Sequence, residues 1–173
     1  MFPRVREHPR NQLHLPYVPA LIHVAGWPQP LEVVVSIQMF ARIYGIAFLV
    51  VGVAGFIPGV TQPHDHPELA LEAGSGLLFG LFPVNALHNL VHLVFGAWGL
   101  FAARGFGSAQ IYARAVAIIY GVLTLMGLIP ATNTTFGLVP IYGHDVWLHA
   151  LLAAIAAYFG FAYRETPAAA ART

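Results

Sequence analysis

Two pairs of polar side chains interrupt apolar stretches of this chain, and they are the residues best suited to chemistry. His88 and His92 are four residues apart, and so are Asp145 and His149. Residues four apart lie on the same face of an α-helix. Imidazole and carboxylate groups together bind zinc, copper and iron. The sequence therefore predicts a metal site made of His88, His92, Asp145 and His149, if the two helices that carry them face one another.

His92 and His149 also allow other interpretations. Histidine is a usual axial ligand of haem iron, so the pair is a candidate for binding one haem, or two separate macrocycles such as haem or chlorophyll, with His88 and Asp145 in support. Polar side chains also join membrane helices without any ligand, contributing about 0.6 kcal/mol each on average. Transfer of protons or of a small solute is a further alternative. The candidate cofactors are thus haem, chlorophyll or a transition metal, with helix adhesion as the interpretation that needs none.

A second, weaker metal site is predicted on the loops that precede these helices. It would combine imidazole and carboxylate ligands from two separate loops. Its members are His64, Asp65, His66 and His144. A His-Asp-His run between prolines is more often simply solvated, so this site ranks below the first.

The composition indicates the elements that must hold these residues. The chain has 173 residues, of which 58% are hydrophobic and 9% charged, and its mean hydropathy is +0.69. Soluble domains carry roughly 25% charged residues, and a helix needs about 20 apolar residues to span a bilayer. Four stretches meet that need, at 43–60, 84–103, 112–130 and 141–163. We expect an all-α, integral membrane four-helix bundle.

The second half of the chain repeats the first. Ala41-Arg42 recurs as Ala113-Arg114, at an offset of 113 − 41 = 72. Further along, 79–84 recurs as 136–141 and His92 as His149, at an offset of 149 − 92 = 57. The difference, 72 − 57 = 15, is an insertion in the first copy. Repeats of this kind determine architecture, and here they predict two tandem, pseudo-symmetric helical hairpins over about 40–104 and 112–164.

The basic residues indicate how the helices are oriented. Cytoplasmic loops carry an excess of Lys and Arg, and all eight basic residues here are arginines that fall before the first stretch, around the link between the second and third, or after the fourth. Both termini are therefore predicted to be cytoplasmic. Four arginines at the ends of stretches are predicted to sit at the membrane interface, namely Arg42, Arg104, Arg114 and Arg164.

Domain boundaries follow from composition. Six prolines fall between residues 1 and 30, and proline at that density opposes regular structure. We expect a disordered arm at 1–37, a membrane domain at 38–165 and a short tail at 166–173. Because the first repeat opens near Phe40, Met39 is an alternative start of the chain. In the insertion, the run Glu68 to Glu72 predicts a short helix capped near Asp65.

Three motifs carry a family resemblance. They run from Ala41-Arg42 to Gly59, from Asn85 to His92, and from Tyr142 to His149. With them, the chain from about Phe40 to Arg164 resembles the bacterial family called domain of unknown function 4383. The resemblance implies a small multi-pass protein of the bacterial cytoplasmic (inner) membrane, similar in outline to DoxX-type proteins, with no established activity.

The predicted function is that of a non-enzymatic subunit or assembly factor of a larger membrane complex. No nucleophile elbow, phosphate-binding loop or dinucleotide fingerprint is found in the sequence, and a formal charge of +1 does not suit nucleic acid. The expected partners are the lipid bilayer and other membrane-protein helices or a second copy. Small residues suited to such packing are Gly45, Gly52 and Gly55 in the first stretch and Ala150, Ala153, Ala154 and Ala157 in the fourth.

Overall fold

The structure is a computed structural model that describes residues 35–64, 66 and 69–164. Nearly all of the predicted arm at 1–37 and the whole tail at 166–173 lie outside the described residues. The elements are, in order, α1 (Ile37–Ala54), β1 (Thr61–Pro63), β2 (Gly76–Leu78), β3 (Phe82–Val84), α2 (Ala86–Ala102), α3 (Phe106–Gly127), α4 (His144–Ala157) and the short π-helix η1 (Tyr158–Ala162). The expected four helices are confirmed, but the all-α prediction was incomplete because a small sheet is present.

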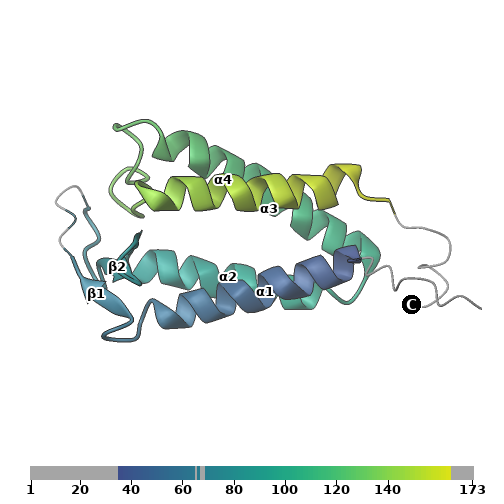
Figure 1. The fold of residues 1–173 in the computed structure, drawn as a ribbon, viewed down its shortest axis with the longest axis horizontal. Helices are drawn as coiled ribbons and strands as arrows, with labels where there is room; N and C mark the ends of the chain where they lie inside the picture. The colour runs from purple at the N-terminus through teal and green to yellow at the C-terminus, as the bar shows by residue number, and fades with distance from the viewer. Residues whose placement is uncertain (1–34, 65, 67–68, 165–173) are drawn as a thin grey trace, which may run out of the picture. The chain divides into compact units, whose positions relative to one another are not determined.

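The helices form two antiparallel pairs. The most extensive helix contacts join α1 to α2 and α3 to α4, and the two pairs meet chiefly where α1 touches α3. In Figure 1 the first pair lies below the second, with the sheet at the left. The start of α1 and the end of η1 both lie at the end away from the sheet. After four helices the chain has therefore returned to the end where α1 starts.

α1 begins six residues before the predicted position at Ile43. The side chain of Ser36 caps it, accepting a hydrogen bond of 3.1 Å from the Met39 amide. Ile37 and Phe40 are buried in the core of the bundle, which makes the first turn part of the packed structure. The predicted stretch began directly after Arg42. Arg42 in fact lies within α1, where its side chain is exposed, so its charge does not end the helix.

The starts of α2 and α4 were predicted too early, at Val84 and Ile141. Val84 instead ends β3, and α2 begins at Ala86 after the cap residue Asn85. α4 begins only at His144. In both cases the residues before the helix are held in extended or turn conformations by hydrogen bonds to the loops, which an apolar sequence pattern does not report.

The insertion in the first half forms a sheet instead of the predicted helix. β1, β2 and β3 pair antiparallel in that order. The described residues 69–72 are not helical. The reason lies in their hydrogen bonds, since the amides of Ala70 and Leu71 both donate to the carbonyl of Gly137, at 2.9 and 3.3 Å. A loop of the second half thus takes the donors that a helix would have used.

α1 and α2 approach one another backbone to backbone. A Cβ added at Gly45 would lie 2.8 Å from the amide nitrogen of Leu100 and 2.9 Å from the carbonyl oxygen of Gly96. One added at Gly52 would lie 2.9 Å from the carbonyl oxygen of Asn89. These glycines therefore fill an interface within the chain. The prediction that Gly45, Gly52 and Gly55 form a surface for partner helices was wrong, because all three are buried within the chain.

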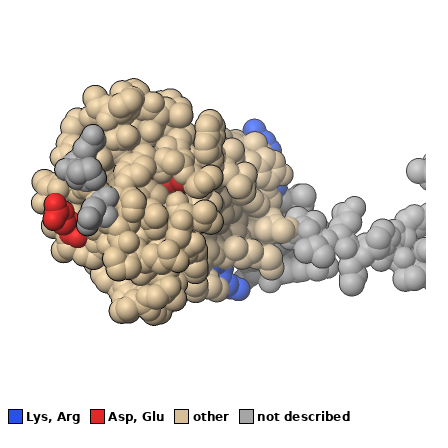
Figure 2. Space-filling model, turned by 60° about the vertical axis from the view of Figure 1, so that its left-hand side comes forward, with Lys and Arg blue, Asp and Glu red and all other residues tan. Residues whose placement is uncertain are grey.

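Three helical segments among the described residues are long and apolar enough to cross a membrane: α1, α3 and α4 together with η1. α2 is also apolar but has 17 residues. Large apolar side chains point outward along all four helices, and some are more than half exposed, such as Val50, Phe101, Ile111, Leu125 and Trp147. Figure 2 shows how charge is distributed, with blue residues toward one end, red residues at the other, and between them a surface that is uncharged except for one small red area.

Candidate functional site

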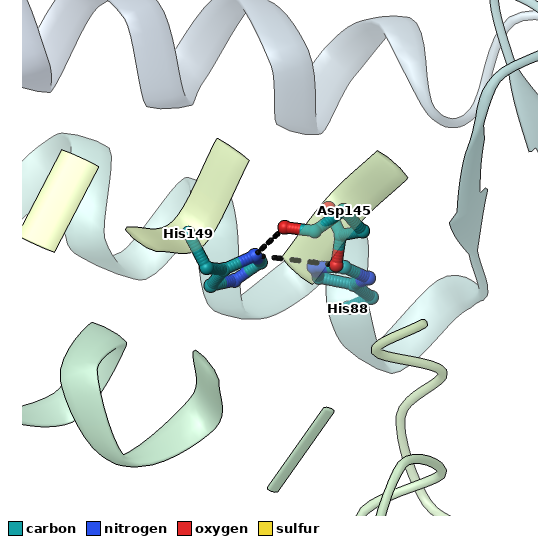
Figure 3. A group of neighbouring side chains, drawn as sticks. All are labelled: His88, Asp145 and His149. Atoms are coloured by element: carbon teal, nitrogen blue, oxygen red, sulfur yellow. Dashed lines mark hydrogen bonds and ion pairs between the residues drawn. The ribbon is translucent and has the colours of Figure 1, made fainter. Parts of the chain in front are cut away.

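Three of the predicted site residues converge between α2 and α4. His88 comes from α2, and Asp145 and His149 come from the first two turns of α4 (Figure 3). One ligand atom from each residue lies within 4.8 Å of the other two. All three side chains are buried, with at most 3% of their surface exposed. In the described part of the chain, this is the one group of three such residues close enough to hold a metal ion.

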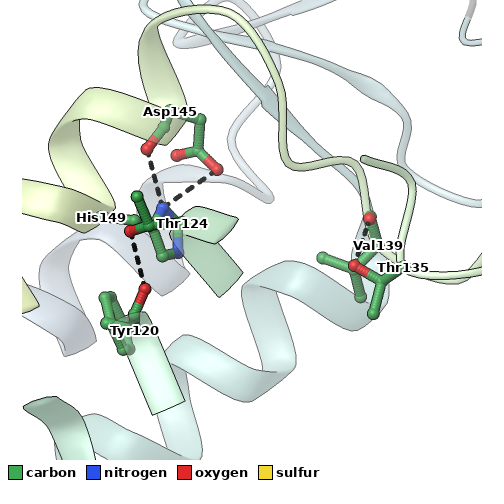
Figure 4. A network of polar contacts seen from close by, with 6 residues as sticks. All are labelled: Tyr120, Thr124, Thr135, Val139, Asp145 and His149. Carbon is green, nitrogen blue, oxygen red and sulfur yellow. Dashed lines mark hydrogen bonds and ion pairs between the residues drawn. The ribbon is translucent and has the colours of Figure 1, made fainter. Parts of the chain in front are cut away.

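Asp145 orients the ring of His149. The Nδ1–H of His149 donates a hydrogen bond of 2.8 Å to the backbone carbonyl of Asp145 and lies 3.3 Å from the carboxylate Oδ2 (Figures 3 and 4). This contact fixes the tautomer, so that Nε2 carries the free lone pair. Metal-bound histidines are commonly held in this way, with the other nitrogen donating to a carbonyl or a carboxylate.

His92 lies beside this group but outside it. Its ring centre is 4.6 Å from that of His88. Phe48 of α1 stacks on His92 at 5.6 Å, and Tyr120 of α3 stacks on His149 at 4.6 Å (Figure 4). Phe48 and Tyr120 also stack on one another at 5.5 Å. Four rings therefore form a continuous stack through the centre of the bundle, flanked by His88.

Phe48 and Tyr120 were missed by the sequence analysis. Their signal was present in the repeat, since 120 − 48 = 72 is the offset that relates the first helix of each copy. The signal was hard to notice because the residue type differs between the copies.

Two polar atoms of this cluster have no partner. Nδ1 of His88 and Nδ1 of His92 are buried without a hydrogen bond, whereas Oδ2 of Asp145 faces the Nδ1–H of His149 at 3.3 Å. Among the described residues, no hydrogen bond joins His88 or His92 of α2 to Asp145 or His149 of α4. A buried polar group without a partner costs roughly 1–3 kcal/mol. Helix adhesion alone does not account for such atoms, because adhesion through polar residues requires hydrogen bonds between the helices.

Two cavities reach the cluster from opposite sides. The larger, of about 300 Å³, lies between α1 and α4. The smaller, of about 220 Å³, lies between α2 and α3. His88, His92, Tyr120 and His149 line both. The cluster therefore occupies the floor of two apolar openings that separate the two helix pairs.

The small residues of α2 leave no room for a flat macrocycle beside His92. A Cβ at Gly96 would lie 2.8 Å from the amide nitrogen of Leu49, and one at Gly99 would lie 2.9 Å from the Cα of Gly45. α1 fills this space. The glycines of α2 thus allow α1 to approach closely. They provide no space beside His92 for a haem held between His92 and His149.

The predicted outer metal site is not assembled among the described residues. Asp65 lies outside them, and His144 is exposed at the start of α4. His66 is buried and already engaged, because its Nε2–H donates to the carbonyl of Gly76 at 3.3 Å and its Nδ1 accepts a hydrogen bond from the Tyr142 hydroxyl. The ring of His64 only packs against that of His66, 4.9 Å away. His66 therefore connects the sheet to the loop before α4.

The four arginines predicted at the membrane interface are all exposed. Arg104 lies over the ring of Phe101, 4.8 Å from its centre. The guanidinium Nε of Arg114 donates a hydrogen bond of 2.8 Å to the carbonyl of Gly160, within η1. A π-helix changes the backbone hydrogen-bond pattern, and Arg114 here pairs with one of its carbonyls. Arg42 and Arg164 are exposed at the end of the bundle where α1 starts and η1 ends.

Comparison with known proteins places the chain in a family without assigning it an activity. No curated protein and no solved structure gives a significant match. The profile of one family matches residues 38–162, a span that includes all four helices and the whole polar cluster. The protein, with apolar helices compatible with a membrane, belongs to that family, the domain of unknown function DUF4383.

Proposed function

We propose that this protein binds a transition-metal ion inside a membrane, at His88, Asp145 and His149. The observation that carries the proposal is the convergence of three buried side chains with metal-ligand atoms within 4.8 Å of one another, of which His88 has an Nδ1 without a hydrogen bond. Two imidazoles and a carboxylate form a chemically sensible donor set for Zn²⁺ or Fe²⁺.

The distances fit an ion after a small closure of the side chains. Metal bonds of about 2.0–2.2 Å in a tetrahedral site place ligand atoms about 3.3 Å apart, whereas the three donors here lie within 4.8 Å of one another. Asp145 and His149 are on adjacent turns of one helix, so the closure is a rotamer change of His88 toward them. Three protein ligands would leave one position for a further ligand, and the ring of His92 lies beside the group, 4.6 Å from that of His88.

The membrane placement is part of the same proposal. All four helices would span the bilayer, including α2, whose 17 residues are at the lower limit of about 17 for a spanning helix. Both termini would face the cytoplasm across a bacterial inner membrane. This orientation is supported by the described arginines, which gather at the end where α1 starts and η1 ends (Figure 2).

The tandem repeat also belongs to the proposal. Two pairs of stacked rings support it, since Phe48 on His92 and Tyr120 on His149 are related by the offsets of 72 and 57 that relate the two copies. His88 and Asp145 occupy equivalent positions but differ in type. The metal would therefore lie off the axis of pseudo-symmetry, toward Asp145.

Metal titration of the purified full chain tests the proposal. In lipid nanodiscs after chelator treatment, we expect one equivalent of Co²⁺ to produce the visible absorption of a tetrahedral site, and Zn²⁺ to displace it. His149→Ala should weaken binding by more than about 100-fold, beyond the range of second-shell changes. His92→Phe should weaken it by less than about tenfold.

His144→Ala is the matched control, because it removes an exposed histidine from the same helix. Its affinity should equal that of the wild type. Two results would contradict metal binding. One is the absence of saturable Co²⁺ absorption, and the other is a His149→Ala variant that loses stability but keeps its metal. A Soret or chlorophyll absorption band in the untreated protein would show that the ligand is a macrocycle and not a single metal ion.

A role as subunit or assembly factor of a larger membrane complex is the second candidate. It is supported by α4, where Ala154 is exposed and Ala150 is half-buried, whereas Ala153 and Ala157 pack against the core. Small residues allow a partner helix to approach closely. Co-purification of a defined larger assembly, lost on Ala154→Leu, would support this role, whereas a monomer with bound metal would favour the first.

A further inference from the structure

The larger cavity opens sideways, between α1 and α4. Its walls are formed by Ile43, Ala47 and Val51 of α1 and by Leu148 and Leu152 of α4. Ile43, Ala47 and Leu148 are themselves exposed, so the cavity is continuous with the outer surface of these two helices. Both helices are long and apolar enough to lie in a bilayer. The opening therefore faces the depth at which lipid chains would lie.

The floor of this cavity differs sharply from its walls. Asp145 is the only charged side chain among the residues that line it. Nδ1 of His92 points to no hydrogen-bond partner although the side chain is only 7% exposed. A neutral imidazole can present an N–H to an acceptor oxygen. The combination of apolar walls and a small polar floor is typical of ligand sites, in which a few polar groups orient a largely apolar molecule.

We infer that this cavity admits a lipid-soluble molecule from the bilayer, with a carbonyl head that accepts a hydrogen bond from His92. A volume of about 300 Å³ is at the lower end of the range of about 300–1,000 Å³ for ligand pockets. It holds a head group the size of one ring, and the tail stays outside, between α1 and α4. A water-soluble molecule would have to cross the apolar walls, which disfavours it.

The second cavity opens between α2 and α3 and is the smaller of the two. Two wall residues of the larger cavity have counterparts that line the smaller one: Ala47 corresponds to Ile119 (119 − 47 = 72) and Leu152 to Phe95 (152 − 95 = 57). Both counterparts are larger. The cavity that they line, between α2 and α3, has a volume of about 220 Å³. At the matched position in the larger cavity, the small side chain of Ala47 leaves space that Ile119 fills in the smaller one.

Photo-crosslinking tests this inference. The probe is a long-chain ketone with a diazirine beside the carbonyl, incorporated into nanodiscs with the full chain, and labelled peptides are identified by mass spectrometry. We expect labelling that saturates, is competed by the unlabelled ketone and maps to α1 and α4. Ala47→Trp should reduce it by about tenfold, equivalent to a loss of one decade in affinity.

Two variants serve as matched controls. Ile119→Trp places the same bulk in the second cavity, and Val50→Trp places it on the exposed side of α1 that does not line the larger cavity. Both should label like the wild type. His92→Phe should reduce labelling by about five- to tenfold, the effect of one lost hydrogen bond.

The result is separable from metal binding when both are measured on the same preparation. Labelling that persists in chelator-treated protein, and in His149→Ala, would establish the entrance whether or not an ion binds. Labelling that does not saturate, or that Ala47→Trp and Val50→Trp leave equally unchanged, would overturn the inference and indicate only contact with bulk lipid.

Discussion

The two helix pairs pack by different means. In the first pair, Gly45 and Gly52 bring the backbone of α1 against that of α2. Their counterparts in the second pair are Ala117 and Thr124, at the offset of 72. Thr124 donates a hydrogen bond of 2.7 Å to the Tyr120 carbonyl on its own helix (Figure 4). In the second pair the close backbone contact lies elsewhere, at Gly160 of η1, where a Cβ would lie 3.0 Å from the amide nitrogen of Arg114. The two pairs thus place their closest backbone contacts at different points along the helices.

The ends of the pairs differ as well. Asn85 is fully buried and caps α2 by accepting a 2.9 Å hydrogen bond from the His88 amide. Its side-chain amide also donates to the carbonyls of Leu71 and Leu138, at 2.9 and 2.7 Å. The residue before α4 is Gly143, which makes no side-chain cap. One residue of the first pair thus holds loops from both halves together.

The largest effect is expected from breaking the backbone contact. Gly45→Val would push two methyl groups into the Leu100 and Gly96 backbone, and it should cost about 4 kcal/mol, above the usual cost of an overpacked core. Ala117→Val, its counterpart, should cost about 1 kcal/mol. The free energy of unfolding in mixed micelles measures both. Equal costs would show that the two pairs pack in the same way.

The second largest effect is expected from removing the side chain of Asn85, which joins loops from both halves. Asn85→Ala deletes one cap and two donated hydrogen bonds, and it should cost about 3 kcal/mol. Asn85→Ser keeps an acceptor for the His88 amide, so it should recover about 1 kcal/mol of this loss. The same unfolding assay measures both. If the two variants are equally unstable, the hydrogen bond to the His88 amide contributes nothing, and Asn85 stabilises the fold only through its hydrogen bonds to the two loops.

The smallest effect is expected at a glycine that both copies keep, Gly55 in the first and Gly127 in the second. A Cβ at Gly127 would lie 2.7 Å from the Ile141 carbonyl oxygen, whereas one at Gly55 would meet the end of the Asn89 side chain. A side chain can move aside more easily than a backbone carbonyl. Gly127→Ala should therefore cost about 2 kcal/mol and Gly55→Ala about 1 kcal/mol.

Asn89→Ala provides the control for this difference. In that background Gly55→Ala should become nearly neutral, while Gly127→Ala should keep its full cost. A Gly55→Ala cost that survives Asn89→Ala would mean that the backbone of α2, and not the Asn89 side chain, sets the limit at this position.

Much of the helical core was predictable because its signals are local. Apolar runs identified four helices, and the spacing of four residues placed His88 and His92, like Asp145 and His149, on single helix faces. The sequence did not reveal that His92 would stand outside the group of three. That outcome depends on how α2 is rotated against α4, which the packing of Phe48 and Tyr120 determines.

The sheet and the loop contacts were not predictable for a different reason. Strands of three residues such as Thr61–Pro63 are too short to show an alternating pattern. The run around Leu71 looked helical in isolation, but the Gly137 carbonyl, far along the chain, takes its amides. The contacts of His66, a member of the predicted outer metal site, could not be foreseen for the same reason, since its partners include Gly76 and Tyr142, and neither is close to it in sequence.

The pairing of α1 with α2 and of α3 with α4 also has a consequence for biogenesis. Helices that contact their neighbours in sequence form quickly and with little loop-closure entropy, and chains fold from the N-terminus as they are synthesised. The first pair can therefore insert and assemble while the second is still being translated. Asp145 and His149 reach His88 only when the second pair docks, so the polar cluster is the last part of the molecule to be completed.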